Sequence, residues 1–160
     1  MSKQYLHIRC ANPNSNPTLI LSSPAPCSLH KEMAYYPPEQ INACAAQAEL
    51  PNLEIQNIWI NINTPGAYNT LHNHAGAVLS GVYYVKSDPS QGNIMFERND
   101  GAEYFLPPIE KANYFTSTAT TYKAMTGAIY VFPGWLKHSV QPNLTKEDRL
   151  SISFNYGVKR

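Results

Sequence analysis

Three of the five histidines are spaced so that they could bind one metal ion. His72 and His74 are separated by one residue, and in an extended chain such residues project to the same face. His138 follows the turn at Pro133-Gly134, which lies between two apolar segments. Imidazole nitrogen binds Zn, Fe, Cu or Ni, and three imidazoles alone do not choose among these metals. The pattern therefore predicts a three-histidine metal site.

A second candidate group lies further along the chain. Ten residues separate Arg149 from His138, and Ser151 shares a strand face with Arg149. A planar guanidinium beside a hydroxyl donor suits a carboxylate ligand. The alternative for Arg149 alone is a surface ion pair with the neighbouring Glu147 or Asp148. We favour the carboxylate-binding interpretation because the histidines precede this group.

Short strands should position these side chains. After Pro51 the chain alternates between β-branched or aromatic segments and turns rich in Gly, Pro and Asn, which is typical of a β-sandwich or barrel. The stretch 99–123 lacks strand patterning and is expected to be a long loop of functional importance. Strands are predicted at residues 58–63, 81–85, 93–97, 128–132, 136–140 and 150–156.

The N-terminal part contains one clear helix. Residues 1–38 have no readable pattern beyond a short strand near residues 18–21, whereas the Ala-rich segment 39–50 has helical periodicity and ends before Pro51. We expect one domain over residues 1–160, with an N-terminal segment at 1–50 and a β core at 55–158. The inner face of the helix should carry Ile41, Cys44, Ala45 and Ala48. Trp59 and Trp135 should pack in or near the core.

The composition excludes several classes of protein. Of the 160 residues 43% are hydrophobic and 14% are charged, with a net charge of +1. A nucleic-acid-binding domain normally has a basic surplus, and a disordered chain has fewer apolar residues. No apolar run is long enough for a transmembrane helix, and residues 1–10 lack the apolar region of a signal peptide. Three cysteines without a CxxC pair favour a reducing cytoplasm.

Taken in order, the motifs of residues 55–158 resemble a family of small 2-oxoglutarate- and Fe(II)-dependent oxygenases, found in bacteria and in phages of cyanobacteria. The resemblance covers about two thirds of the chain, and its motifs are specific only in combination. They are Trp59-Ile60-Asn61, Pro65-Gly66-Ala67-Tyr68-Asn69, His72-Asn73-His74, Leu79-Ser80-Gly81-Val82-Tyr83-Tyr84-Val85, Phe132-Pro133-Gly134-Trp135-Leu136-Lys137-His138 and Arg149-Leu150-Ser151-Ile152-Ser153-Phe154-Asn155.

The resemblance implies a double-stranded β-helix, also called a jelly roll or cupin-like fold, that is mostly β with an N-terminal helix. It implies Fe(II), 2-oxoglutarate as cosubstrate, and O2. His72 and His138 take the positions of metal ligands in the superfamily, and His74 stands where the superfamily has Asp or Glu. Arg149 takes the position that binds the distal carboxylate of 2-oxoglutarate, with Ser151 as its helper. Tyr68 or Asn69 could also contact the cosubstrate.

The expected function is hydroxylation of a small molecule or a protein side chain, in the cytoplasm or, for a phage gene, in the host cytoplasm. No nucleic-acid or membrane partner is expected, and the exposed edges of a jelly roll are compatible with a homodimer. Two alternatives stay open. One is a three-histidine cupin-like metalloenzyme that does not use 2-oxoglutarate, and the other is a non-catalytic jelly-roll binding module.

Overall fold

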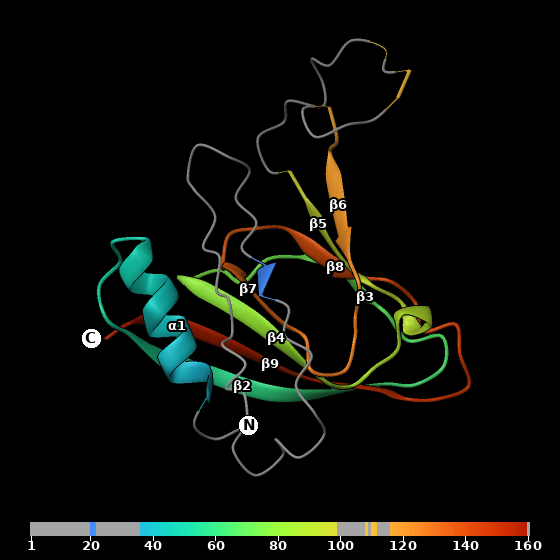
Figure 1. The fold of residues 1–160 in the computed structure, drawn as a ribbon, viewed down its shortest axis with the longest axis horizontal. Helices are drawn as coiled ribbons and strands as arrows, with labels where there is room; N and C mark the ends of the chain where they lie inside the picture. Colours follow the sequence, from blue (N-terminus) through green and yellow to red (C-terminus); the bar gives the residue numbers. More distant parts are fainter. Residues whose placement is uncertain (1–19, 22–35, 99–107, 109, 112–115, 160) are drawn as a thin grey trace, which may run out of the picture.

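Two antiparallel sheets face each other in the computed structural model, which describes residues 20–21, 36–98, 108, 110–111 and 116–159 (Figure 1). The larger sheet has the strand order β1-β7-β4-β9-β2, and the smaller has the order β3-β8-β5-β6. The strands are β1 (Ile20–Leu21), β2 (Leu53–Asn63), β3 (Asn69–His72), β4 (Leu79–Lys86), β5 (Ile94–Glu97), β6 (Ala119–Tyr122), β7 (Ile129–Pro133), β8 (His138–Val140) and β9 (Arg149–Val158).

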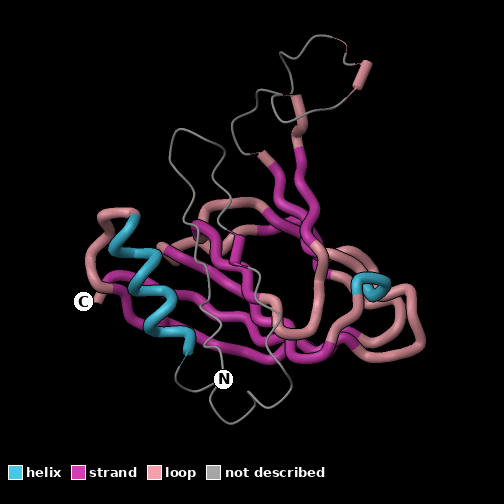
Figure 2. The backbone as a smooth tube through the Cα atoms, viewed as in Figure 1, coloured by secondary structure: helices cyan, strands magenta, loops and turns pink. Residues whose placement is uncertain are grey.

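The order of the strands along the chain identifies the architecture. From β2 to β9 the chain contributes β2, β4, β7 and β9 to one sheet and β3, β5, β6 and β8 to the other. Figure 2 shows these strands as two layers linked by loops at their ends. This arrangement is the double-stranded β-helix, or jelly roll, so the predicted fold class is confirmed.

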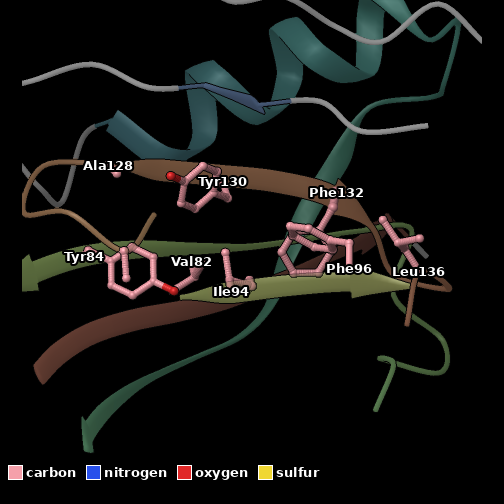
Figure 3. Close-up of a cluster of buried hydrophobic side chains, with 9 residues drawn as sticks. Val82, Tyr84, Ile94, Phe96, Ala128, Tyr130, Phe132 and Leu136 are labelled. Atoms are coloured by element: carbon pink, nitrogen blue, oxygen red, sulfur yellow. The ribbon is translucent and has the colours of Figure 1, made fainter. Parts of the chain in front are cut away.

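The space between the sheets holds an aromatic core. Side chains from β4, β5 and β7 meet there, and Figure 3 shows them pointing into the same interior. Phe96 packs edge-on against Phe132, with ring centroids 4.9 Å apart. The buried members are Val82, Tyr84, Ile94, Phe96, Ala124, Ala128, Tyr130, Phe132 and Leu136. This core fixes the relative position of the two sheets, and with it the position of the site between them.

A second core lies on the outer face of the larger sheet, under the helix α1 (Tyr36–Gln47). Ile41, Cys44 and Ala45 are buried against residues of the sheet that include Phe154 and Tyr156, which confirms three members of the predicted inner face. The prediction for Ala48 is wrong, because the helix ends at Gln47 and Ala48 is exposed in the turn that follows. The helix also begins earlier than expected, with two prolines in its first turn.

Two strands were absent from the sequence prediction. Both β3 and β6 are four residues long. Each pairs with a strand that is distant in the sequence, β3 with β8 and β6 with β5. The prediction of a loop over residues 99–123 is therefore wrong for its last part, and residues 99–107, 109 and 112–115 lie outside the described chain. No helix among the described residues is long and apolar enough to cross a membrane.

Candidate functional site

The imidazoles of His72, His74 and His138 form one cluster between the two sheets. One nitrogen from each ring lies within 4.8 Å of the others, which is a spacing that a single metal ion can bridge. The ring centroids are 4.3 Å apart for His72 and His138, and 5.1 Å apart for each pair that includes His74. His138 is buried, and the other two are partly exposed, so the cluster opens toward solvent on one side.

The strands explain why these three side chains meet. His72 ends β3 and His138 begins β8, and the two residues are directly paired in the antiparallel ladder. His74 lies just after β3, where its backbone N–H donates to the carbonyl of Gly134 at 2.8 Å. A side chain at Gly134 would collide with the backbone of Ala77, so glycine allows the two loops to approach this closely.

Backbone carbonyls orient two of the rings. The Nδ1 atom of His72 lies 2.7 Å from the carbonyl oxygen of Thr70, and that of His138 lies 3.0 Å from the carbonyl oxygen of Leu136. A proton on Nδ1 satisfies both carbonyls and leaves Nε2 of each ring as the metal-binding atom. The geometry therefore holds two imidazoles in the form that a metal requires.

Burial disfavours the charged forms of His138 and His74. Loss of solvation lowers the pKa of His138 to about 4, although its hydrogen bond to Leu136 opposes that effect and the nearby His72 and His74 add to it. The pKa of His74 is also lowered, first by burial and then by His72. A neutral imidazole is the form that binds metal, so His138 needs no deprotonation at neutral pH.

Arg149 is the most unusual buried residue near the cluster, since none of it is exposed to solvent. Its Nη1 atom donates to three backbone carbonyls, those of Gln91, Gly92 (3.1 Å) and Gln141 (3.3 Å). These three oxygens fix the plane of the guanidinium from one side. The alternative of a surface ion pair for Arg149 is excluded by its burial.

The rest of the guanidinium has no partner. The Nε and Nη2 atoms of Arg149 are buried without a hydrogen bond in the described structure, and so is the hydroxyl of Tyr84. Burial raises the pKa of the Tyr84 phenol, even though Arg149 lowers it, so this hydroxyl stays a protonated donor. Buried donors without acceptors are costly, and grouped donors of this kind point to an anionic ligand.

One cavity of about 80 Å³ joins the histidines to this arginine. None of its lining residues is acidic, so Arg149 has no counter-charge there. The lining consists of Trp59, Asn61, Asn63, Asn69, His72, His74, Gly81, Val82, Tyr84, Ile94, Phe132, His138, Val140, Arg149, Ser151 and Ser153. The site therefore offers a candidate metal position and a candidate anion position in the same cavity.

The other predicted site residues divide into two groups. Ser151 and Asn69 line the cavity, and Asn69 accepts a bond of 3.4 Å from Asn63. Tyr68 is 60% exposed and does not line it. Of the two tryptophans predicted in or near the core, Trp59 is partly buried and lines the cavity, with its ring 5.7 Å from that of His74. The prediction is wrong for Trp135, which is 49% exposed.

Tyr84 is the residue that the sequence analysis missed. The pattern Gly81-Val82-Tyr83-Tyr84-Val85 predicts a strand with its two tyrosines on opposite faces, but it does not say which tyrosine faces inward. The signal that could have found it is the pairing of β4 with β9, which sets Tyr84 opposite Ser151.

Comparison with known proteins agrees with this chemistry. A family model described as "Putative 2OG-Fe(II) oxygenase" matches residues 57–155, a stretch that contains the three histidines, Tyr84, Arg149 and Ser151. The chain belongs to this family. A search of curated proteins found no match to this chain.

Solved structures share the fold of this family member. The α-ketoglutarate-dependent epimerase SnoN from nogalamycin biosynthesis is 18% identical with a TM-score of 0.57, over 79% of this chain and 57% of that chain. A prolyl-4-hydroxylase from Pseudomonas putida is 18% identical with a TM-score of 0.53, over 76% and 62%. HygX from Streptomyces hygroscopicus, crystallised with nickel and 2-oxoglutarate, is 15% identical with a TM-score of 0.52, over 74% and 63%. The chain thus spans about three fifths of the length of these proteins.

The residues present fit the metal and the cosubstrate of the family. Three imidazoles within reach of one point suit iron, and unpartnered donors at Arg149 and Tyr84 suit the carboxylate of 2-oxoglutarate. The metal-binding group differs from the two-histidine, one-carboxylate set that is usual for non-haem iron oxygenases. Three neutral ligands would leave the positive charge of a bound Fe(II) uncompensated, and the dianion 2-oxoglutarate would offset it.

Proposed function

We propose that the protein is an Fe(II)- and 2-oxoglutarate-dependent oxygenase in which His72, His74 and His138 bind the iron. The observation that carries the proposal is the cavity in which these imidazoles and the unpartnered donors of Arg149 face the same space. The same observation favours this function over a three-histidine enzyme without 2-oxoglutarate. A buried arginine with no acid beside it is costly unless an anion binds there.

Each group has a separate task in this proposal. Arg149 and the Tyr84 hydroxyl bind the distal carboxylate of 2-oxoglutarate, and Ser151, which lines the same cavity, donates to it as a helper. The carbonyls of Gln91, Gly92 and Gln141 occupy the Nη1 side, so only the Nε and Nη2 side of the guanidinium is available to the ligand. The cosubstrate is therefore bound in one orientation.

The polar wall beside the iron position belongs to β2 and β9. Asn61 donates to the Ser153 hydroxyl at 2.9 Å, and Asn63 donates to Asn69. We propose Asn69 as a further contact to the cosubstrate, and we leave out Tyr68 because it does not line the cavity.

When iron, 2-oxoglutarate and O2 are bound, they supply the oxidising chemistry that yields succinate and CO2 and transfers oxygen to a substrate. The chain contributes geometry and exclusion of water. Val82, Ile94 and Phe132 give the cavity an apolar side, which keeps water from the reacting centre and strengthens the electrostatic contacts of Arg149.

The substrate class proposed is a small molecule or a protein side chain, and hydroxylation is the proposed reaction. The proposed compartment is the cytoplasm, which is the host cytoplasm if a phage encodes the gene, because a reducing environment keeps the iron as Fe(II). A nucleic acid is not proposed as a partner, since the net charge is only +1.

The experiment that tests this function is anaerobic titration of the full chain with Fe(II) and then with 2-oxoglutarate. We expect a visible metal-to-ligand charge-transfer band that saturates at one equivalent of iron. Substituting His138→Ala should abolish the band, because it removes the most buried ligand. In air, the loaded protein should convert 2-oxoglutarate to succinate, at least slowly and without a substrate.

The control variant separates the two parts of the site. Arg149→Gln should leave the binding of Fe(II) intact and weaken the binding of 2-oxoglutarate by at least about tenfold. Hydrogen bonds to charged groups are worth about 1.5–3 kcal/mol. Iron binding without any effect of 2-oxoglutarate would contradict the proposal and favour the three-histidine alternative. Tight Zn binding with no turnover would favour the binding module.

A further inference from the structure

Beyond the register irregularity between Ile55 and Asn57, the edge strand β2 lacks the features that usually protect a sheet edge. It is 11 residues long and ends the larger sheet, with β9 as its one neighbour among the described strands. Proteins normally shorten such edges or place charges and prolines on them, because free N–H and C=O groups pair with other chains. Residues 55–63 read Ile-Gln-Asn-Ile-Trp-Ile-Asn-Ile-Asn and contain no charged residue, proline or glycine. This edge is therefore competent to pair.

The outer face of the same strand is apolar and uncovered. Ile58, Ile60 and Ile62 are 55%, 68% and 62% exposed. In the pairing of β2 with β9, these isoleucines lie opposite Phe154, Ile152 and Leu150. Together the six side chains form an apolar row that crosses the two strands. The helix α1 covers the Phe154 end of this row, and no described residue covers Ile60 or Ile62 to that degree. A contiguous apolar surface at a free edge marks an interaction site.

The sequence of β2 is self-complementary about Ile60. In an antiparallel pair of two β2 strands centred there, Ile58 lies opposite Ile62, and Asn57 lies opposite Asn63. On the inner face, Trp59 lies opposite Asn61. No charged residue meets another within the paired segment, because the first acidic residue, Glu54, lies outside it. Twofold symmetry requires a surface that matches itself, and this strand does.

We propose that β2 pairs antiparallel with β2 of a second copy of the chain, with Ile60 on the twofold axis. The pairing joins the two larger sheets into one continuous sheet. The helix α1 packs at the Leu53 end of β2, so an antiparallel pair places the two helices at opposite ends, where they do not collide.

The dimer also reaches the proposed active site, although it does not depend on the proposed function. Trp59 and Asn61 line the cavity from β2. In this register the partner's Trp59 lies beside Asn61, at the margin of the cavity. The second copy thus adds an aromatic side chain beside the polar wall of the site.

Sedimentation and light scattering of the full chain over a range of concentrations test the proposal. The wild type is expected to have the mass of a dimer at micromolar concentrations. Ile60→Lys should weaken association at least tenfold, because it sets two ammonium groups opposite each other across the axis. Ile60→Thr keeps a β-branched side chain and should weaken it less. The matched control is Leu144→Lys, at a residue that is 85% exposed in the loop before β9, and it should leave the dimer intact.

Cross-linking tests the register. Copies with Ile58→Cys mixed with copies with Ile62→Cys should form a cross-linked dimer with a short bismaleimide, and Ile60→Cys should cross-link to itself. The wild type, treated alike, controls for Cys10, Cys27 and Cys44. A monomer at every concentration overturns the proposal. So does a monomer whose outward β2 amides exchange slowly, since another part of the same chain then covers the edge. A dimer that Ile60→Lys leaves unchanged overturns it as well.

Discussion

At the scale of single residues, Arg149 determines what the cavity can bind. A guanidinium has five N–H donors, and here the described structure satisfies only those on Nη1. Burial lowers the pKa of Arg149, with Tyr84 opposing the effect, but the group keeps its charge near neutral pH. A buried charge needs a partner, and the lining supplies none. In the proposed function that partner is the distal carboxylate of 2-oxoglutarate, which has two acceptor oxygens.

Substitution Tyr84→Phe should weaken the binding of 2-oxoglutarate about tenfold or more and leave Fe(II) binding unchanged. It removes a hydroxyl that donates to a charged carboxylate, a bond worth about 1.5–3 kcal/mol. The free protein should lose no stability, because that hydroxyl has no partner without the ligand. The measurement is the dissociation constant of 2-oxoglutarate from the charge-transfer titration.

The matched control for this variant is Tyr156→Phe. Tyr156 is also buried with an unpartnered hydroxyl, but it belongs to the core under α1 and not to the cavity. If both variants weaken 2-oxoglutarate equally, Tyr84 has no specific contact with the cosubstrate.

The sequence predicted the residues that line the cavity better than their surroundings. The predicted residues stand out by their chemical type and their spacing, and all five line the cavity: His72, His74, His138, Arg149 and Ser151. Tyr84 and Trp59 are ordinary strand residues, and only the pairing of strands shows that they face inward. The alternating pattern places Ile58, Ile60 and Ile62 on one face, but alternation alone does not tell a buried face from an exposed one.

At the scale of elements, a short 3-10 turn and two loops set the position of Arg149. Gln91 ends the turn η2 (Pro89–Gln91), and its side chain donates to the carbonyl of Glu147 at 2.8 Å. Asn143, which is fully buried, donates to the carbonyls of Asn63 and Glu147. These bonds connect the end of β2 to the start of β9. No local sequence pattern predicts them, because each joins residues far apart in the chain or within an irregular loop.

Gly92→Ala should both destabilise the protein and weaken the binding of 2-oxoglutarate. Gly92 has φ of +87°, and an added Cβ would lie 2.3 Å from the carbonyl oxygen of Gln141 and 2.6 Å from that of Pro142. To relieve those contacts the backbone must shift at Gly92 and Gln141. Their carbonyls are two of the three that accept hydrogen bonds from Arg149. We expect a loss of about 2 kcal/mol or more in the free energy of unfolding, from strain and from the collision. Urea denaturation and the 2-oxoglutarate titration measure the two effects.

Gly66→Ala is the control for backbone strain alone. Gly66 has a similar φ of +82°, but an added Cβ would meet nothing within 4 Å. It should cost about 1 kcal/mol and leave the affinity for 2-oxoglutarate unchanged. Equal losses of affinity in the two variants would show that the carbonyl group around Arg149 plays no special part.

The short strands show where element prediction fails. Asn-Thr-Leu-His in β3 and Ala-Thr-Thr-Tyr in β6 have too few apolar residues to show an alternating pattern. They are strands because β8 and β5 provide hydrogen-bonding partners. The longer β4 and β9 were predicted nearly to their ends, since burial on both faces or clean alternation marks them in the sequence.

At the scale of the whole molecule, the jelly roll places a buried, neutral histidine in the three-histidine cluster between its sheets. Burying this neutral histidine lowers the stability of the metal-free protein at acid pH. His138 has a pKa of about 4 in the folded state against 6.5 for the free side chain, mainly because burial disfavours the imidazolium. Below pH 6.5 the unfolded chain takes up a proton that the folded chain does not, so unfolding is favoured.

The metal-free protein should therefore lose stability as the pH falls from about 6.5 to about 4, by up to about 3 kcal/mol from His138, and His74 adds to the loss in the same direction. Thermal unfolding in the presence of a chelator, at a series of pH values, measures this loss. The variant His138→Asn should show a shallower dependence in the same range, because it has no proton to gain at that position. Adding a divalent metal at pH 7 should stabilise the wild type and not the variant. A wild-type profile that is flat between pH 6.5 and 4 would contradict the burial of a neutral His138.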